Sequence, residues 1–247
     1  GGIFETPSLP RADITGADLT DAKFLNANLS RAKLNGAILR RTDLNGSDLS
    51  EADLSIADLT GASLTDVKLI GANMERIKLN QGKLSGAKLC GAKMNKGKLF
   101  QVDLSKADLS GANLTGADLT ESNLQDCDLS RANLTEAILL KANLKTTFLI
   151  GANMQKAELA EVNLEDANIA GAKLRNTNFQ KANLKNVNLQ RSDMEHADFS
   201  QANLTESNLT GSKLGEAIFR NADLTGADLN LADTTDTDFS GAKGYNS

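Results

Sequence analysis

Apolar residues recur along this chain at every fifth position. From Ile14 to Phe239 the step of five gives 46 consecutive positions, of which 34 are Leu and only Thr234 is polar. Two residues before each of them stands a small residue, which is Ala in 29 cases. The residue between the two is mostly Asp, Asn or Lys. The chain therefore repeats a unit that can be written A(D/N)Lxx.

A period of five excludes the common regular elements. It matches neither the 3.6-residue period of an amphipathic helix nor the two-residue period of a continuous strand. It does fit a short extended step that is followed by a corner. In such a step the Ala and Leu side chains point to one side and the residue between them points to the other. We therefore expect the Ala and Leu positions to form the core.

A longer period of twenty residues indicates how many corners close one turn. All four Met residues are separated by multiples of twenty, and so are the central Phe residues near the C-terminal end. Stacking of like on like favours four units per square turn. The residues that show this period are Met74, Met94, Met154 and Met194; Phe179, Phe199, Phe219 and Phe239; and Asn123, Asn143, Asn163, Asn183 and Asn203.

The repeat resembles that of the pentapeptide-repeat family. Its signature is matched by Ala17-Asp18-Leu19 and Ala112-Asn113-Leu114, among many others, and the resemblance covers residues 12–243. It implies an all-β fold, a right-handed quadrilateral β-helix of about 11 to 12 coils. We expect residues 1–11 to form an N-terminal lead-in or cap and residues 244–247 to form a tail. Phe4 and Leu9 keep the five-residue register, and Pro7 and Pro10 remove backbone donors, so this segment should blunt the first coil.

The core pattern leads to three further expectations. Ile77, with the valines at 67, 102, 162 and 187, should strain or widen the narrow bore. The Asn row from 123 to 203 should form stacked side-chain amides. The Phe column from 179 to 239 should fill the core, and it suggests an end-to-end homodimer through the last coil.

No group of residues indicates catalysis or a cofactor. His196 is the only histidine and falls at a corner, where an ordinary surface residue is the simpler interpretation. Cys90 and Cys127 are 37 residues apart at different repeat positions, so we expect two free thiols and no metal site. The outward Ser and Thr residues have no base to activate them. We predict no catalytic, cofactor-binding or metal-ligating residue, and no enzyme activity.

Basic residues concentrate between positions 66 and 98. Eight cations stand there against Asp66 and Glu75, although the whole chain carries a net charge of −5. This basic belt could dock an acidic partner, anionic lipid or a polyanion. The alternative is inter-coil ion pairing, because a step of twenty pairs five of its lysines with aspartates: Lys68 with Asp48, Lys78 with Asp58, Lys83 with Asp103, Lys88 with Asp108 and Lys98 with Asp118. The belt consists of Lys68, Arg76, Lys78, Lys83, Lys88, Lys93, Lys96 and Lys98.

A few apolar residues occupy positions that should face outward. Ile38, Ile138 and Ile218 share one column of the twenty-residue period, and Phe148 lies in another. Isolated exposed apolar residues are common, so they are neutral or mark a contact surface.

These features favour a non-enzymatic scaffold, a rigid rod that binds a protein partner and no nucleic acid. Leu-rich, loop-free rods of this kind look most like cyanobacterial and thylakoid-associated members of the family, including a heterocyst-glycolipid membrane protein. The alternative that the family implies is a DNA mimic that inhibits or protects DNA gyrase. The weak net charge and the basic belt depart from that pattern. A pocket for a small molecule is not indicated.

The chain contains no apolar run long enough to cross a bilayer, so we expect no membrane insertion within this segment. It opens with Gly1-Gly2 instead of methionine, which is typical of a piece excised from a longer protein. We therefore expect a parent protein that could be membrane-anchored. The compartment is unknown, and a bacterial cytoplasm or a membrane surface fits best.

Overall fold

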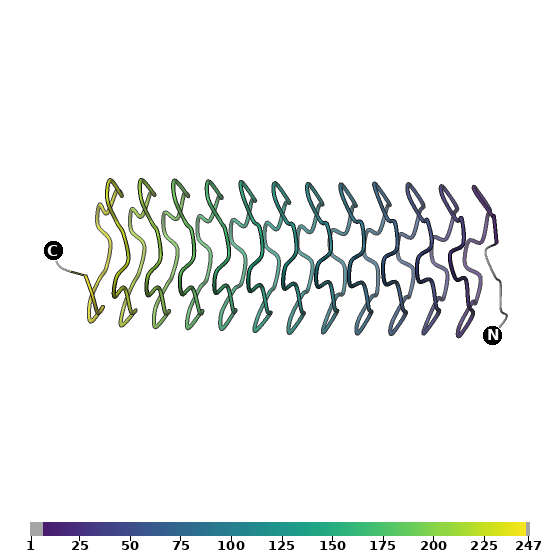
Figure 1. Cartoon of the computed structure of the whole chain (residues 1–247), viewed down its shortest axis with the longest axis horizontal. Coiled ribbons are helices and arrows are strands. Elements are labelled where there is room, and N and C mark those ends of the chain that lie inside the picture. Colours follow the sequence, from purple (N-terminus) through teal and green to yellow (C-terminus); the bar gives the residue numbers. More distant parts are fainter. Residues whose placement is uncertain (1–6, 246–247) are drawn as a thin grey trace.

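The chain forms a straight solenoid whose coils stack along one axis, with the two ends of the chain at opposite ends of the rod (Figure 1). The computed structural model describes residues 7–245. Within that range there is no helix and no continuous strand, only isolated parallel bridges that join residues twenty apart, from Ser8 and Asn28 to Asp223 and Lys243. Twenty residues therefore make one coil. The expected blunting by Phe4 lies outside the described residues.

Corners explain why no strand grows longer. The carbonyl of Leu19 accepts a hydrogen bond from the amide of Ala22 at 3.0 Å, and Asp21 between them has a φ of 59°. This is the geometry of a type II turn, which needs a positive φ at its third residue. Every fifth residue from Arg11 to Gly241 has a positive φ. One corner every five residues leaves too few extended residues for a regular strand.

Outward Asp and Asn residues close these corners. Asp18 Oδ1 accepts hydrogen bonds from the amide of Thr20 at 3.0 Å and from its hydroxyl at 2.6 Å. Asn113 makes the same two contacts with Thr115. Asx turns of this kind satisfy an amide that the coil ladder leaves free. The Asp or Asn of the repeat therefore has a structural role.

The Ala and Leu positions form one continuous core, as predicted. Leu59, Leu119 and Leu164 have no exposed surface, and neither have Ala57 and Ala117. Near the C-terminal end the core is a column of parallel rings. The centroids of Phe179, Phe199, Phe219 and Phe239 follow one another at 4.8, 4.7 and 5.2 Å, and Tyr245 covers Phe239 at 3.8 Å. The last ring of the column is thus covered by the chain itself, and the expected end-to-end dimer stays a prediction.

Most polar residues in the small-residue row have hydrogen-bond partners, although the buried hydroxyls of Ser207 and Ser212 have none among the described residues. The hydroxyl of Thr147 donates to the carbonyl oxygen of Leu124 at 2.9 Å, and that of Thr177 donates to Met154 at 2.8 Å. Buried polar groups with partners lose little on burial. The same bond, 23 residues back along the chain, is made by Thr42, Ser47, Ser122, Cys127, Ser192 and Thr237.

The bulkiest residue of that row, Ile77, is fully buried, and Gly97 lies next to it in the following coil. A Cβ on Gly97 would come within 3.4 Å of Ile77 Cγ2 and 3.0 Å of the Met94 carbonyl oxygen. A large side chain in one coil is therefore matched by a missing one in the next. Whether the bore also widens at this level stays a prediction.

This pairing predicts a coupled effect on stability. We expect Gly97→Ala to lower the free energy of unfolding by about 1–3 kcal/mol, because the new methyl group lies 3.0 Å from the Met94 carbonyl oxygen and is held there by contacts of 3.4 Å with Ile77 Cγ2 and Leu99 Cδ1. In the Ile77→Ala background the same change should cost clearly less. Urea unfolding of the two single variants and the double variant measures the coupling. An equal loss in both backgrounds would contradict the packing that we describe.

Candidate interaction surface

All eight cations of the basic belt are exposed, and none of them takes part in an ion pair among the described residues. Elsewhere the rod does form such pairs. Arg31 binds Glu51 at 2.9 Å, Arg41 binds Asp21 at 2.6 Å and Arg175 binds Asp193 at 2.7 Å. The belt therefore lies in a stretch without direct ion pairs, between the pair of Arg40 with Asp58 and the pair of Lys141 with Glu161.

The prediction of ion pairs between the belt and its neighbouring coils is wrong, because none of the five expected lysine–aspartate pairs is in contact. The register is as expected, because Asp48 is bridged to Lys68 and Asp118 to Lys98. The carboxylates, however, turn toward their own corners: Asp48 accepts from the Ser50 amide at 2.9 Å and Asp118 from the Thr120 hydroxyl at 2.7 Å.

Asp58, the expected partner of Lys78, also binds elsewhere. Its carboxylate lies 2.7 Å from Arg40 and accepts a further bond from the Thr60 hydroxyl. Burial raises the pKa of Asp58, but the bonds from Thr60 and Arg40 outweigh it and lower that pKa. Lys83 and Lys88 likewise have no carboxylate within 4.0 Å among residues 7–245.

Within the belt, like charges lie side by side. Lys68 is bridged directly to Lys88, and Lys78 to Lys98, in adjacent parallel coils. Neighbouring like charges on paired strands destabilise a sheet. Because the two rows are ten residues apart in a coil of twenty, they lie on opposite sides of the rod.

Six belt lysines also occupy positions where Asp or Asn would close a corner. No side chain of the described residues bonds the amide of Asn80 after Lys78, of Ile70 after Lys68 or of Cys90 after Lys88. A typical hydrogen bond contributes about 0.5–1.5 kcal/mol. The corners after Lys68, Lys78 and Lys88 therefore lack this stabilisation, whereas the Phe100 amide after Lys98 donates to Asn80 Oδ1 at 3.1 Å. The six lysines are Lys68, Lys78, Lys83, Lys88, Lys93 and Lys98.

One part of the belt forms a surface depression, here called the basic hollow. It has a volume of about 500 Å³ and is lined by Ile56, Arg76, Lys78, Lys96 and Lys98. Ile56 is 56% exposed and has a φ of 53°. A positive φ is unusual for a β-branched residue. Four unpaired cations thus surround an exposed apolar side chain on a strained corner.

The outward apolar residues are only partly exposed. Phe148 is 50% exposed and Ile38 is 36% exposed, whereas Ile138 and Ile218 are half-buried. Phe148 lies in the column of Lys68 and Lys88, so these residues do not form one surface with Ile38. The repeat pattern missed other exposed apolar side chains because they stand at the variable positions of the unit. These are Ile56, Ile70, Leu140, Ile150 and Leu231.

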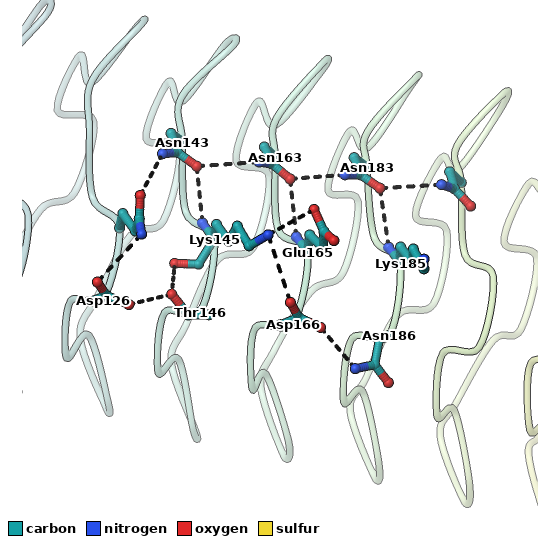
Figure 2. Close-up of polar contacts among 12 residues, drawn as sticks. Asp126, Asn143, Lys145, Thr146, Asn163, Glu165, Asp166, Asn183, Lys185 and Asn186 are labelled. Atoms are coloured by element: carbon teal, nitrogen blue, oxygen red, sulfur yellow. Dashed lines mark hydrogen bonds and ion pairs between the residues drawn. The ribbon is translucent and has the colours of Figure 1, made fainter.

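The Asn row forms the predicted amide ladder (Figure 2). The Nδ2 atom of each Asn donates to the Oδ1 atom of the Asn one coil earlier, at 3.3 Å from Asn143, 3.4 Å from Asn163, 3.0 Å from Asn183 and 3.3 Å from Asn203. The same Oδ1 atoms accept from the next corner amides, such as Lys145. The ladder leaves these amides little capacity to bind a ligand.

The single histidine also has a structural contact. His196 Nδ1 lies 3.4 Å from Glu216 in the next coil. No three His, Cys, Asp or Glu side chains of residues 7–245 are grouped so that they could hold a metal ion. No helix in the same range is long and apolar enough to cross a membrane. The expected membrane-anchored parent protein stays a prediction.

Both cysteines are free thiols in different surroundings. Cys90 is exposed and lines a surface depression of about 460 Å³ with Ser110, Gly111, Ser130, Arg131 and Ile150. Cys127 is fully buried and its thiol donates to the Leu104 carbonyl oxygen at 2.7 Å. Burial raises the pKa of Cys127 to about 12.

Thiol labelling should separate the two cysteines. The thiolate is the reactive form, so Cys90 should react with N-ethylmaleimide in the folded protein while Cys127 stays unmodified until the rod unfolds. Mass spectrometry of peptides with and without urea measures this. The Cys90→Ser variant, which should take up no label when folded, is the control. Labelling of native Cys127 would contradict the packed core.

Acid should destabilise the rod. Hydrogen bonds from Ser240 and Arg220 lower the pKa of Asp238 from 3.8 to about 2. A carboxylate whose pKa is lower in the folded state stabilises that state above its unfolded pKa, and this stabilisation is lost as the pH falls toward the folded pKa. We expect the thermal midpoint to fall between about pH 4 and pH 2. Asp238→Asn should show a smaller fall, and an unchanged midpoint in the native protein would contradict the prediction.

Comparisons with known proteins agree with the repeat. The model of pentapeptide repeats matches residues 12–50, 22–60, 57–95, 98–135 and 202–241, and that of the pentapeptide repeat region matches residues 122–199. Comparison with curated protein sequences gives no match.

Solved structures are similar over most of the chain. HetL, a pentapeptide repeat protein involved in heterocyst differentiation regulation in the cyanobacterium Nostoc sp. strain PCC 7120, is 32% identical over 92% of this chain and 89% of its own, with a TM-score of 0.34. QnrB1, a plasmid-mediated fluoroquinolone resistance protein, is 19% identical over 94% and 88%, with a TM-score of 0.36. By its matched repeats, which cover most of the sequence, this chain belongs to the pentapeptide-repeat family of right-handed quadrilateral β-helices, which are repeat scaffolds.

Proposed function

We propose that this rod is a non-enzymatic scaffold that binds a protein partner along its side, through the basic belt. The observation that carries the proposal is the pair of like-charge rows, Lys68 with Lys88 and Lys78 with Lys98. These lysines replace residues that would close corners, and none of them lies within 4.0 Å of a carboxylate of the described residues. Binding of a partner of opposite charge would explain why the surface carries lysines that lower the stability of their own coils.

The stiffness of the rod supports this role. Each coil is bonded to the next through the backbone at every corner, and the core is continuous along the axis. Such a solenoid holds its surface residues at fixed spacings before any partner arrives. Binding then requires little ordering of the scaffold, which favours affinity. Phe148 and Ile150 add an exposed apolar contact on the side of Lys68 and Lys88.

Photo-crosslinking in cells of the source organism tests the proposal. We expect p-benzoylphenylalanine in place of Lys88 or Phe148 to capture a distinct protein. The same group in place of Lys33 or Arg220, which bind Asp13 and Asp238, should capture only background. Equal background at all four positions would contradict the proposal. A gyrase supercoiling assay is the separate test of the DNA-mimic alternative, which stays a prediction.

A further inference from the structure

The basic hollow differs from the rest of the belt in its shape and its lining. Two cations of one coil, Arg76 and Lys78, lie beside two of the next, Lys96 and Lys98, around one depression of about 500 Å³. The other belt lysines project from the faces of the rod in separate columns. Adjacent coils are ~4.8 Å apart, so the four charges can contact one compact group of anions at the same time.

No cation of this hollow lies within 4.0 Å of a carboxylate of the described residues. The column of Lys78 and Lys98 has a carboxylate on each side, Asp58 before and Asp118 after. Asp58 is bound by Arg40 and Asp118 is bound by Thr120. The hollow thus presents four cations whose nearest carboxylates in that column are already engaged.

Ile56 gives the hollow an apolar border. Its side chain is 56% exposed, and its corner has a φ of 53°, where Gly, Asn or Asp is ordinarily found. Its neighbours in the same column are Gly36 and Arg76. Every corner of the rod has a positive φ, so Ile56 is distinguished from most other corner residues by its exposed apolar side chain, at a position that Arg, Lys, Glu and Gly occupy elsewhere. A ligand made only of phosphate or carboxylate groups would make no use of this side chain.

We propose that the basic hollow binds an acidic segment of a partner protein in which an apolar side chain lies next to closely spaced carboxylates. The carboxylates contact Arg76, Lys78, Lys96 and Lys98, and the apolar side chain covers Ile56. Arginine binds a carboxylate with two parallel hydrogen bonds, so Arg76 sets the orientation of the segment. The assignment rests on the proposed scaffold function, because it names the chemistry that this scaffold recognises.

The test uses the full chain and a fluorescein-labelled peptide of glutamates around a central leucine, with binding followed by fluorescence anisotropy at ~0.1 M salt, where charges are screened over about 10 Å. Lys78→Asn combined with Lys98→Asn should weaken binding by about tenfold or more, because two of the four charges are lost. Both substitutions place a corner-closing residue at these positions, so the thermal midpoint should stay the same or rise. Loss of binding could not then be attributed to unfolding.

Lys68→Asn with Lys88→Asn is the matched control. It removes the same charge from the same two coils and closes equivalent corners on the opposite side of the rod. We expect its affinity for the peptide to stay within about twofold of that of the native protein, since Lys68 and Lys88 lie on the opposite side of the rod from the hollow and salt at ~0.1 M screens charges over about 10 Å. An equal loss in both double variants would show that binding follows net charge alone and would overturn the hollow as a site.

The role of Ile56 has its own variant. Ile56→Asn relieves the strained corner, since Asn adopts a positive φ readily, and removes the apolar contact. It should weaken binding of the leucine peptide severalfold and leave unchanged the binding of a peptide with glutamine in place of leucine. Equal affinity of the native protein for both peptides would overturn the apolar part of the assignment.

Two further outcomes overturn the assignment without touching the scaffold function. In the first, a single-stranded oligonucleotide or inorganic polyphosphate binds more tightly than the peptide, and this binding is lost in the Lys78 and Lys98 double variant. The hollow would then be a general polyanion site. The other is no peptide binding at all while crosslinks at Lys88 or Phe148 persist. Absence of crosslinks together with peptide binding at the hollow would instead overturn the wider scaffold role.

Discussion

Hydrogen bonding between successive coils requires every coil to contain the same number of residues. In this rod the bonded partners are twenty residues apart along nearly the whole described chain. A register of this kind brings chemically equivalent positions into columns. The core, the amide ladder from Asn123 to Asn203, the stacked phenyl rings and the rows of like charge are all consequences of that one constraint.

The constraint also separates the positions that stabilise the rod from those that are free to vary. Ala and Leu fill the bore, and Asp or Asn closes each corner. A residue that departs from these roles weakens its own coil, and the departures concentrate between residues 66 and 98. In a repeat fold the role of a residue is therefore inferred by comparison with the other residues of its column.

Much of this structure could be predicted from the sequence, because the periods of five and twenty report directly on backbone geometry. The five-residue step identified the core, and the Met and Phe columns identified the coil. The side-chain contacts of the belt could not be predicted from register. A carboxylate that is placed beside Lys78 has a closer partner in the corner that follows it, and Asp58 also has Arg40. The capping of Phe239 by Tyr245 was missed because Tyr245 lies outside the repeat. Ile56 was missed because the corner position accepts Arg, Lys and Glu as well as Gly, so its type carries little information about its role.

Because every coil has the same length, the angle about the rod axis between two surface features can take only a few discrete values. Insertion or deletion of one five-residue unit turns everything beyond it by a quarter turn about the axis, whereas gain or loss of a whole coil shifts it by ~4.8 Å without any rotation. The angle about the axis between the basic hollow and the side that bears Phe148 and Ile150 can thus change only in quarter turns, by gain or loss of five-residue units. Homologues whose lengths differ by whole coils preserve which partners share a side of the rod, and homologues that differ by a single unit do not.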